Sequence, residues 1–177
     1  KCALALAEGM VLGNYVFDKY KSDRKRNNIQ EICIVGSKIS PSDLKCFNAI
    51  TKAVFYSRDL VNEPLSYLTA KKLGQEVQKL GRVCGFKTAV FGKAEILKMK
   101  MGGLLAVNKG SLDPPSFSVM EWKPKAHKNK QPIVFVGKGV VYDTGGLSLK
   151  PTPNSMDLMK CDMSGAASVI GAMCAIA

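Results

Sequence analysis

Histidine and long apolar runs are the features that this 177-residue sequence has least of. No run of eighteen apolar residues occurs, so no transmembrane helix is expected. The only histidine, His127, lies in a Lys-rich loop between Pro124 and Pro132. A histidine-based metal site or a Ser-His-Asp triad would have to be built on that single loop residue. The composition therefore argues against both kinds of site.

Motifs built on paired cysteines or on phosphate-binding glycines are absent as well. The six cysteines include no Cys-x-x-Cys pair, and several lie inside apolar runs. They are expected to be buried, reduced thiols of a cytosolic protein rather than a disulfide framework. No Gly-x-x-x-x-Gly-Lys-Ser/Thr loop is present, which weighs against nucleotide binding.

Acidic residues are few relative to basic ones, and the formal net charge is +12. Such a surface attracts polyanions non-specifically. The positive charge is densest at residues 19–26 and 123–130, but neither patch is interleaved with aromatic side chains. No zinc-finger spacing or RNA-binding signature occurs either. Two solvated loops are therefore the favoured interpretation, and nucleic-acid binding is the alternative.

The order of apolar patterns predicts an α/β protein, because strand patterns alternate with helix patterns. Ser40 and Pro41 are placed to begin a helix, and Thr69 is placed to cap the next one. Residues 102–110 are rich in small side chains and are expected to pack closely against another backbone. Helices are expected at 3–20, 41–60, 69–80, 94–99 and 164–177, and strands at 31–35, 86–91, 116–122 and 132–136.

Charged residues gather between residues 138 and 162, in a stretch that is otherwise mostly apolar or small. Lys138 follows the predicted strand 132–136 and lies between two glycines, at a position where ligands collect in α/β sheets. Asp143, Lys150 and Asp162 follow it. Each one alone fits a turn or a solvated loop. Together, two lysines and two aspartates indicate a site, because buried charges persist when they are paired or metal-bound.

The pattern of residues 136–150 and 156–162 resembles the signature of the leucine aminopeptidase family, the two-metal cytosolic aminopeptidases. The resemblance extends upstream through residues 7–20, 58–69 and 101–115, and so covers nearly the whole chain. It implies an α/β fold in which helices flank a mixed sheet. Residues 1–40 would end an N-terminal domain, 41–60 would form a linking helix, and 61–177 would be the first part of a phosphorylase/hydrolase-like catalytic domain.

The resemblance also implies a role for each site residue. Lys138, Asp143 and Asp162 would be metal ligands, and Asp143 would bridge two divalent ions. These ions are usually zinc, with manganese or magnesium at the more exchangeable site. Lys150 would be catalytic, since it would polarise the scissile carbonyl or stabilise the oxyanion. Met159 would line the pocket for the substrate's N-terminal side chain.

The implied activity is release of leucine-like residues from short peptides with a free N-terminus, by a cytoplasmic homohexamer with no membrane attachment. Two departures from the family pattern stand out. Residues 151–155 form a stretch one residue longer than in many relatives, and the family's next motif, with an aspartate, a glutamate and an arginine, is missing. We therefore expect the chain alone to be a fragment with little or no peptidase activity. The alternative is a non-catalytic or nucleic-acid-binding basic protein of the same fold.

Overall fold

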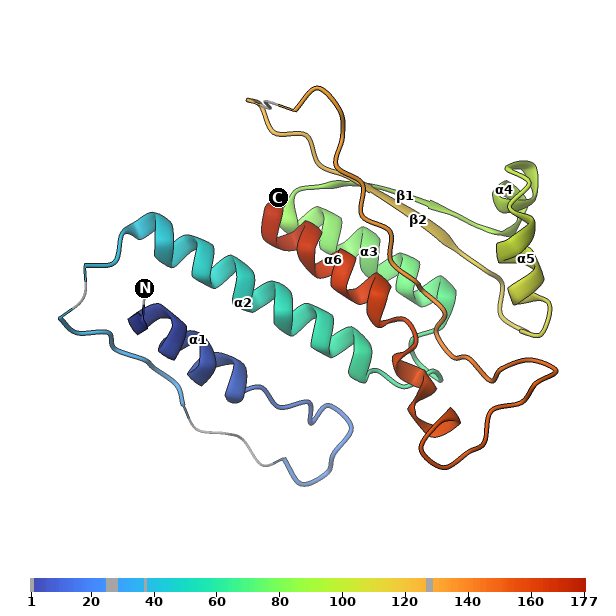
Figure 1. Ribbon diagram of the computed structural model, residues 1–177, viewed down its shortest axis with the longest axis horizontal. Coiled ribbons are helices and arrows are strands. Elements are labelled where there is room, and N and C mark those ends of the chain that lie inside the picture. Colours follow the sequence, from blue (N-terminus) through green and yellow to red (C-terminus); the bar gives the residue numbers. More distant parts are fainter. Residues whose placement is uncertain (1, 25–28, 37, 127–128) are drawn as a thin grey trace.

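The computed structural model describes residues 2–24, 29–36, 38–126 and 129–177, so His127, Lys25 and Arg26 lie outside the described residues. The fold is α/β, with helices flanking a small sheet (Figure 1). In chain order the elements are α1 (Cys2–Gly13), α2 (Pro41–Asn62), α3 (Ala70–Cys84), β1 (Lys87–Phe91), α4 (Lys93–Lys98), α5 (Gly102–Asn108), β2 (Phe117–Glu121), the 3-10 helix η1 (Met156–Cys161) and α6 (Ser164–Ile176). No helix in the described parts of the chain combines the length and hydropathy of a membrane span.

The starts of α2 and α3 confirm the capping expected from the sequence. The Asp43 backbone N–H donates to Ser40 Oγ at 3.0 Å, Asp43 Oδ2 accepts from Ser40, and Pro41 occupies the first turn. Thr69 Oγ1 likewise accepts from the Lys72 backbone N–H, at 3.3 Å. These side chains satisfy backbone groups that the first helical turn leaves unpaired.

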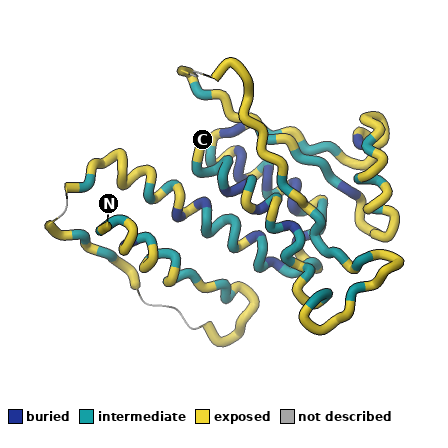
Figure 2. Tube along the Cα trace, in the orientation of Figure 1, coloured by how far each residue is buried: buried dark blue, intermediate teal, exposed yellow. Residues whose placement is uncertain are grey.

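The core lies where α6 packs between α2 and α3, and buried residues gather there in Figure 2. At the crossing of α2 and α6, the Ser57 hydroxyl donates to the Ala167 carbonyl at 2.9 Å. A Cβ on Gly171 would lie only 2.9 Å from the Ala53 carbonyl oxygen. The two backbones therefore approach closely, and the small residues of the 164–177 segment serve this contact. The fully buried core side chains include Val77, Ile96, Met163 and Ile170.

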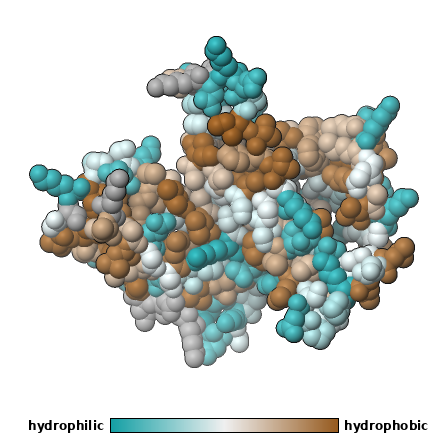
Figure 3. All heavy atoms as spheres, in the orientation of Figure 1, coloured by the Kyte–Doolittle hydropathy of each residue, from teal (hydrophilic) through white to brown (hydrophobic). Residues whose placement is uncertain are grey.

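The sheet differs from the mixed sheet that was expected. It has two antiparallel strands, β1 and β2, with Ala89 opposite Val119, and α3 packs against both. Within the described residues, 132–136 and 31–35 pair with no strand. The physical reason is that a strand needs a neighbour's N–H and C=O groups as well as apolar side chains. Val134 and Val136 are 73% and 91% exposed. Figure 3 shows that hydrophobic residues reach the surface on the face of the molecule turned to the viewer.

The expected helix at 3–20 is also too long, because α1 ends at Gly13. The Asn14 side chain donates to the Ile29 carbonyl at 2.9 Å, and the aromatic residues that follow turn to α2. Tyr15 donates to Asp59 at 2.8 Å, and its ring lies 5.3 Å from that of Phe55. Contacts with α2 thus replace further helical turns in this segment.

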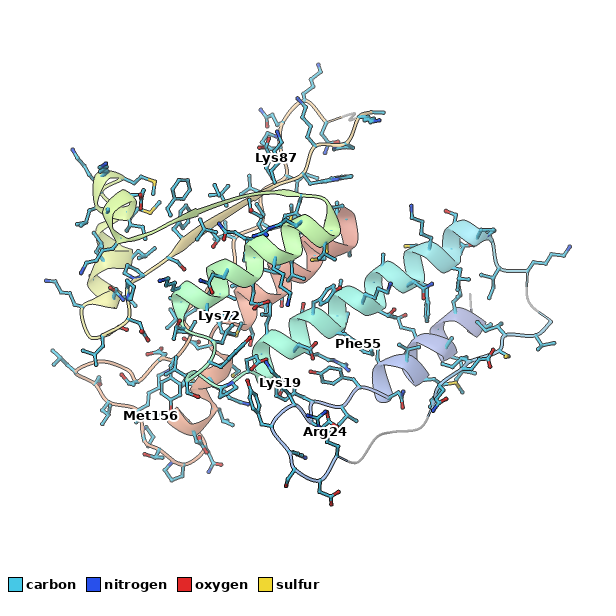
Figure 4. The ribbon with its side chains drawn as sticks, turned by 180° about the vertical axis from the view of Figure 1, so that it is seen from behind. Lys19, Arg24, Phe55, Lys72, Lys87 and Met156 are labelled. Atoms are coloured by element: carbon cyan, nitrogen blue, oxygen red, sulfur yellow. The ribbon has the colours of Figure 1, made fainter. Side chains whose placement is uncertain are left out.

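Residues 18–20 are anchored to the end of α2 by the buried carboxylate of Glu63. Lys19 Nζ lies 2.6 Å from Glu63 Oε1, and the Tyr20 hydroxyl donates to Oε2 at 2.5 Å. The Lys19 ammonium also lies 4.0 Å from the centre of the Tyr67 ring, which Lys72 approaches at 5.2 Å. Figure 4 shows Lys19 and Lys72 coming from different segments toward this end of α2. A buried carboxylate is thereby paired, as burial requires.

Two further expectations are wrong. Residues 102–108 form α5, which contacts α4, but a Cβ on Gly102 or Gly103 would meet nothing within 4 Å, so these glycines serve no close backbone approach. The cysteines are not uniformly buried. Cys2, Cys33 and Cys46 are exposed, and the other three are half-buried. Apolar neighbours in the sequence did not bury these thiols: Cys2 and Cys46 lie on helix faces turned from the core, and Cys33 lies in a segment outside any helix or strand.

Candidate metal centre

The backbone at Gly137 fixes the position of Lys138 against the start of α6. A Cβ on Gly137 would lie 2.5 Å from the Gly165 carbonyl oxygen and 2.7 Å from Ala166 Cα. Only glycine permits this approach. The Ala166 backbone N–H then donates to the Lys138 carbonyl at 2.8 Å. Lys138 is thereby held beside the first turn of α6, immediately next to the end of η1.

Asp162 follows η1 directly and meets the Lys138 side chain. Lys138 Nζ lies 2.8 Å from Asp162 Oδ2. This carboxylate oxygen is buried, and no side chain or backbone group in the described residues donates a well-aligned hydrogen bond to it. The ion pair raises the pKa of Lys138 above its ordinary value, mainly because Asp162 favours the charged ammonium. A buried acceptor that only a cation approaches is suited to a metal ion.

Asp143 lies between the two lysines. Its Oδ2 is 3.2 Å from Lys150 Nζ and 4.0 Å from Lys138 Nζ. Its Oδ1 accepts a hydrogen bond from the Gly145 backbone N–H at 2.8 Å, and Gly145 has a φ of +89°. This N–H, followed by the Lys150 ammonium, holds the pKa of the Asp143 carboxyl below its ordinary value. Asp143 is therefore a carboxylate at neutral pH.

Lys150 and Met159 complete the cluster. Lys150 Nζ lies 3.2 Å from Met159 Sδ, and the Lys150 backbone N–H donates to the Thr144 carbonyl at 2.9 Å. All five residues singled out in the sequence are thus brought together, although Lys138 and Asp162 stand twenty-four positions apart.

The sequence reasoning missed the residues that hold this cluster in place. The Tyr142 hydroxyl donates to the carbonyl of Met156, the first residue of η1, at 2.8 Å. Lys160 donates from η1 to the Asn62 carbonyl at the end of α2, at 3.1 Å. The glycine pair 137 and 165 had a visible signal in the spacing of small residues. The two side-chain contacts had none, because they depend on how distant segments meet.

The donor set fits part of a site for hard divalent cations. Carboxylate oxygens are the ligands that such ions prefer, and a lysine amine becomes a ligand when it loses its proton. In the described parts of the chain, no group of three or more His, Cys, Asp or Glu side chains lies close enough to hold a metal. The two aspartates and Lys138 are therefore an incomplete ligand set that further carboxylates could complete.

Known proteins resemble this chain in sequence and in fold. The family model described as the cytosol aminopeptidase family, catalytic domain, matches residues 55–177. A probable cytosol aminopeptidase of Brucella suis biovar 1 is 42% identical over 182 residues, which cover 99% of this chain and 36% of the relative. The chain thus spans just over a third of the length of the curated relatives that it matches.

Solved structures agree with this match. Caenorhabditis elegans leucine aminopeptidase superposes with a TM-score of 0.81 at 33% identity, over 97% of this chain and 34% of that one. The bottromycin maturation enzyme BotP in complex with Mn gives a TM-score of 0.80 at 34% identity, over 98% and 36% of the two chains. On the strength of the matched family model and these relatives, this chain belongs to the cytosol aminopeptidase family.

Proposed function

We propose that this chain supplies part of the two-metal active site of an aminopeptidase that releases leucine-like residues from the N-terminus of peptides. The observation that carries the proposal is the convergence of Lys138, Asp143, Lys150 and Asp162 in one cluster. Membership in the cytosol aminopeptidase family supports the same reaction. The relative solved with Mn supports a divalent metal, and zinc, manganese and magnesium are the candidates.

In this proposal Asp143, Asp162 and Lys138 hold the ions. Bound divalent ions supply Lewis acidity for the attack of water on a peptide carbonyl. Lys138 would act as a ligand in its neutral amine form, which the charge of a divalent ion favours. Asp143 has its Oδ2 near both lysine ammonium groups, which supports a role for this carboxylate as the ligand that the two ions would share.

Lys150 is placed to stabilise negative charge that develops on the carbonyl oxygen. Its ammonium lies against Asp143 and beside Met159, so it is oriented by one ligand and by the side chain proposed to contact the substrate. A fixed cation that meets charge formed only in the transition state lowers the barrier without a matching gain in substrate binding. Met159, a flexible thioether, suits a pocket for an apolar N-terminal side chain.

The proposal extends to the whole protein. Residues 1–40 would be the end of an N-terminal domain, 41–60 the linking helix and 61–177 the first part of the catalytic domain. The family model's start at residue 55, inside α2, supports a boundary along this helix. A cytoplasmic homohexamer acting on short peptides is the proposed setting, on the basis of the family alone.

Hydrolysis of leucine p-nitroanilide tests the function. A chimera is made in which residues 1–177 replace the matching segment of the Brucella suis relative, so that the remaining active-site segments are present. With Zn²⁺ or Mn²⁺ added, the chimera should hydrolyse the substrate. Lys150→Ala should lower kcat by about 100-fold or more, and Asp143→Ala should abolish activity.

Lys109→Ala is the matched control, since Lys109 is an exposed lysine at the end of α5, outside the cluster. It should leave kcat unchanged. Near-normal turnover by the Asp143 or Lys150 variant, in a chimera whose circular dichroism is unaltered, would refute the assigned roles.

A further inference from the structure

Two half-buried cysteines outside the metal cluster lie together at the ends of two core helices. Cys84 is the last residue of α3, and Cys174 lies in the last turn of α6. Both side chains line the same groove, and the Cys84 side chain neighbours the Cys174 thiol. Both residues pack against the same core cluster, which also contains Leu80 and Ile170 one turn before them. The fold therefore joins two thiols that stand 90 residues apart in the sequence.

The pair faces an open groove rather than the closed core. The groove has a volume of about 570 Å³, and both thiols line it together with Tyr56 and Val83. Lys45 and Lys52, from the same face of α2, also line this groove. Because both sulfurs line an open groove, small oxidants can reach them. Such access distinguishes cysteines that can be oxidised from inert, fully buried ones.

We infer that Cys84 and Cys174 are a peroxide-sensitive dithiol that closes to an intramolecular disulfide linking the C-terminal ends of α3 and α6. The Cys84 thiol gives up its proton and its sulfur attacks one oxygen of hydrogen peroxide, which gives a sulfenic acid and releases hydroxide; the hydroxide takes up that proton to become water. The Cys174 thiol then gives up its proton and its sulfur attacks the Cys84 sulfur, expelling the second water. One peroxide is reduced, two thiols are oxidised, and two waters are formed.

The order of the two steps follows from the surroundings of the pair. Burial, and then contact with Cys84, raises the pKa of the Cys174 thiol above its ordinary value. Cys174 is thus a poor first nucleophile, and it suits the second step, in which it sits against the oxidised sulfur. Gly85, in the left-handed conformation with φ of +92°, ends α3 directly after Cys84. The chain at Cys84 can therefore adjust by turning at the helix end when the bond forms.

The site is independent of the metal cluster, since Lys138 and Asp162 lie at the opposite, N-terminal end of α6. The disulfide would nevertheless tether α6, the helix whose first turn holds the Lys138 backbone. Oxidation closes a loop of about 90 residues and restricts the unfolded chain. It is expected to raise the Tm of the chain by roughly 10 °C.

The test is peptide mapping of the full chain after treatment with hydrogen peroxide and alkylation of the remaining thiols under denaturing conditions. We expect a peptide pair joining Cys84 to Cys174, lighter by two hydrogens than the reduced pair, that dithiothreitol separates. Cys174→Ser should abolish the linked pair, and Cys33→Ser, at an exposed cysteine far along the chain, should leave it intact.

Other products would overturn the inference. These are a disulfide that joins either residue to a different cysteine, or Cys84 oxidised to sulfinic acid while Cys174 remains free. The wild-type map decides between these outcomes without any variant, so a variant that fails to fold does not affect the result.

Discussion

At the scale of single residues, the cluster of Lys138, Asp143, Lys150 and Asp162 depends on carboxylates that face ammonium groups across short distances. Asp162 is the less exposed of the two aspartates, and among the described residues its Oδ2 has the Lys138 ammonium as its ion-pair partner. In the chimera, Asp162→Asn should weaken Zn²⁺ binding at least about tenfold, because a neutral amide is a poorer ligand than a carboxylate. Isothermal titration calorimetry measures this, with Asp113→Asn as the control at an exposed aspartate. Equal affinity in the wild type and the Asp162 variant would remove Asp162 from the ligand set.

Gly137 is the second residue on which the cluster depends. A methyl group there would meet the backbone of Gly165 and Ala166, so Gly137→Ala should cost about 1–3 kcal/mol of unfolding free energy. Gly9→Ala is the matched control, because Gly9 lies inside α1 with nothing within 4 Å of the added Cβ. That change should stabilise the protein by up to about 1 kcal/mol. Urea denaturation measures both. Equal effects of the two changes would show that the Gly137 contact is loose.

The grouping of the five candidate residues could be predicted from the sequence, because it follows from residue type and order. Lys138, Asp143, Lys150, Met159 and Asp162 lie in one cluster, and the metal-binding, catalytic and substrate-binding roles assigned to them stay a prediction. The contacts that position them, such as Tyr142 to Met156, could not be found, because they depend on how separate segments meet. Helix starts at Ser40 and Thr69 were predictable, since caps are local. The absence of a strand partner for residues 132–136, within the described residues, could not be predicted, since strand pairing depends on segments distant in the sequence.

At the scale of elements, the capping of α2 is a local contribution to stability. Ser40→Ala removes the hydroxyl that caps the Asp43 backbone N–H, while the Ser40 backbone N–H can still donate to the Asp43 carboxylate, and the change should cost about 1 kcal/mol. Ser42→Ala, at an exposed position within the same first turn, is the control and should change the unfolding free energy by less than about 0.5 kcal/mol. If both serines gave the same small change, the cap would contribute nothing measurable.

The contact between residues 15–20 and α2 should weaken as the pH becomes alkaline. Burial, and then the hydrogen bond to Asp59, raises the pKa of Tyr15 to about 12. The unfolded pKa is about 10, so the stabilisation is fully present below pH 10 and is lost as the pH rises through about 12. Wild-type stability should therefore fall over this window more steeply than that of Tyr15→Phe. Urea midpoints measured across the window would contradict this if the two proteins lost stability in parallel.

At the scale of the whole molecule, the exposed apolar segment 133–136 stands out. Ile133, Val134 and Val136 are 69%, 73% and 91% exposed. An exposed apolar extended segment with unpaired backbone groups promotes association. The chain should therefore self-associate as its concentration rises, and Val134→Glu should reduce this. Leu112→Lys, at a fully exposed leucine elsewhere, should not. Sedimentation velocity measures the association state of each variant. A wild-type chain that stays monomeric at all concentrations would contradict the expectation.

The most direct measurement of the proposed site is the zinc anomalous signal in crystals of the chimera grown with Zn²⁺. The expected result is a peak at about 2.0–2.2 Å from carboxylate oxygens of Asp143 and Asp162, with Lys138 Nζ turned from its ion pair onto the metal. A peak elsewhere, with Lys138 still paired to Asp162 at saturating zinc, would contradict the metal centre proposed for these residues.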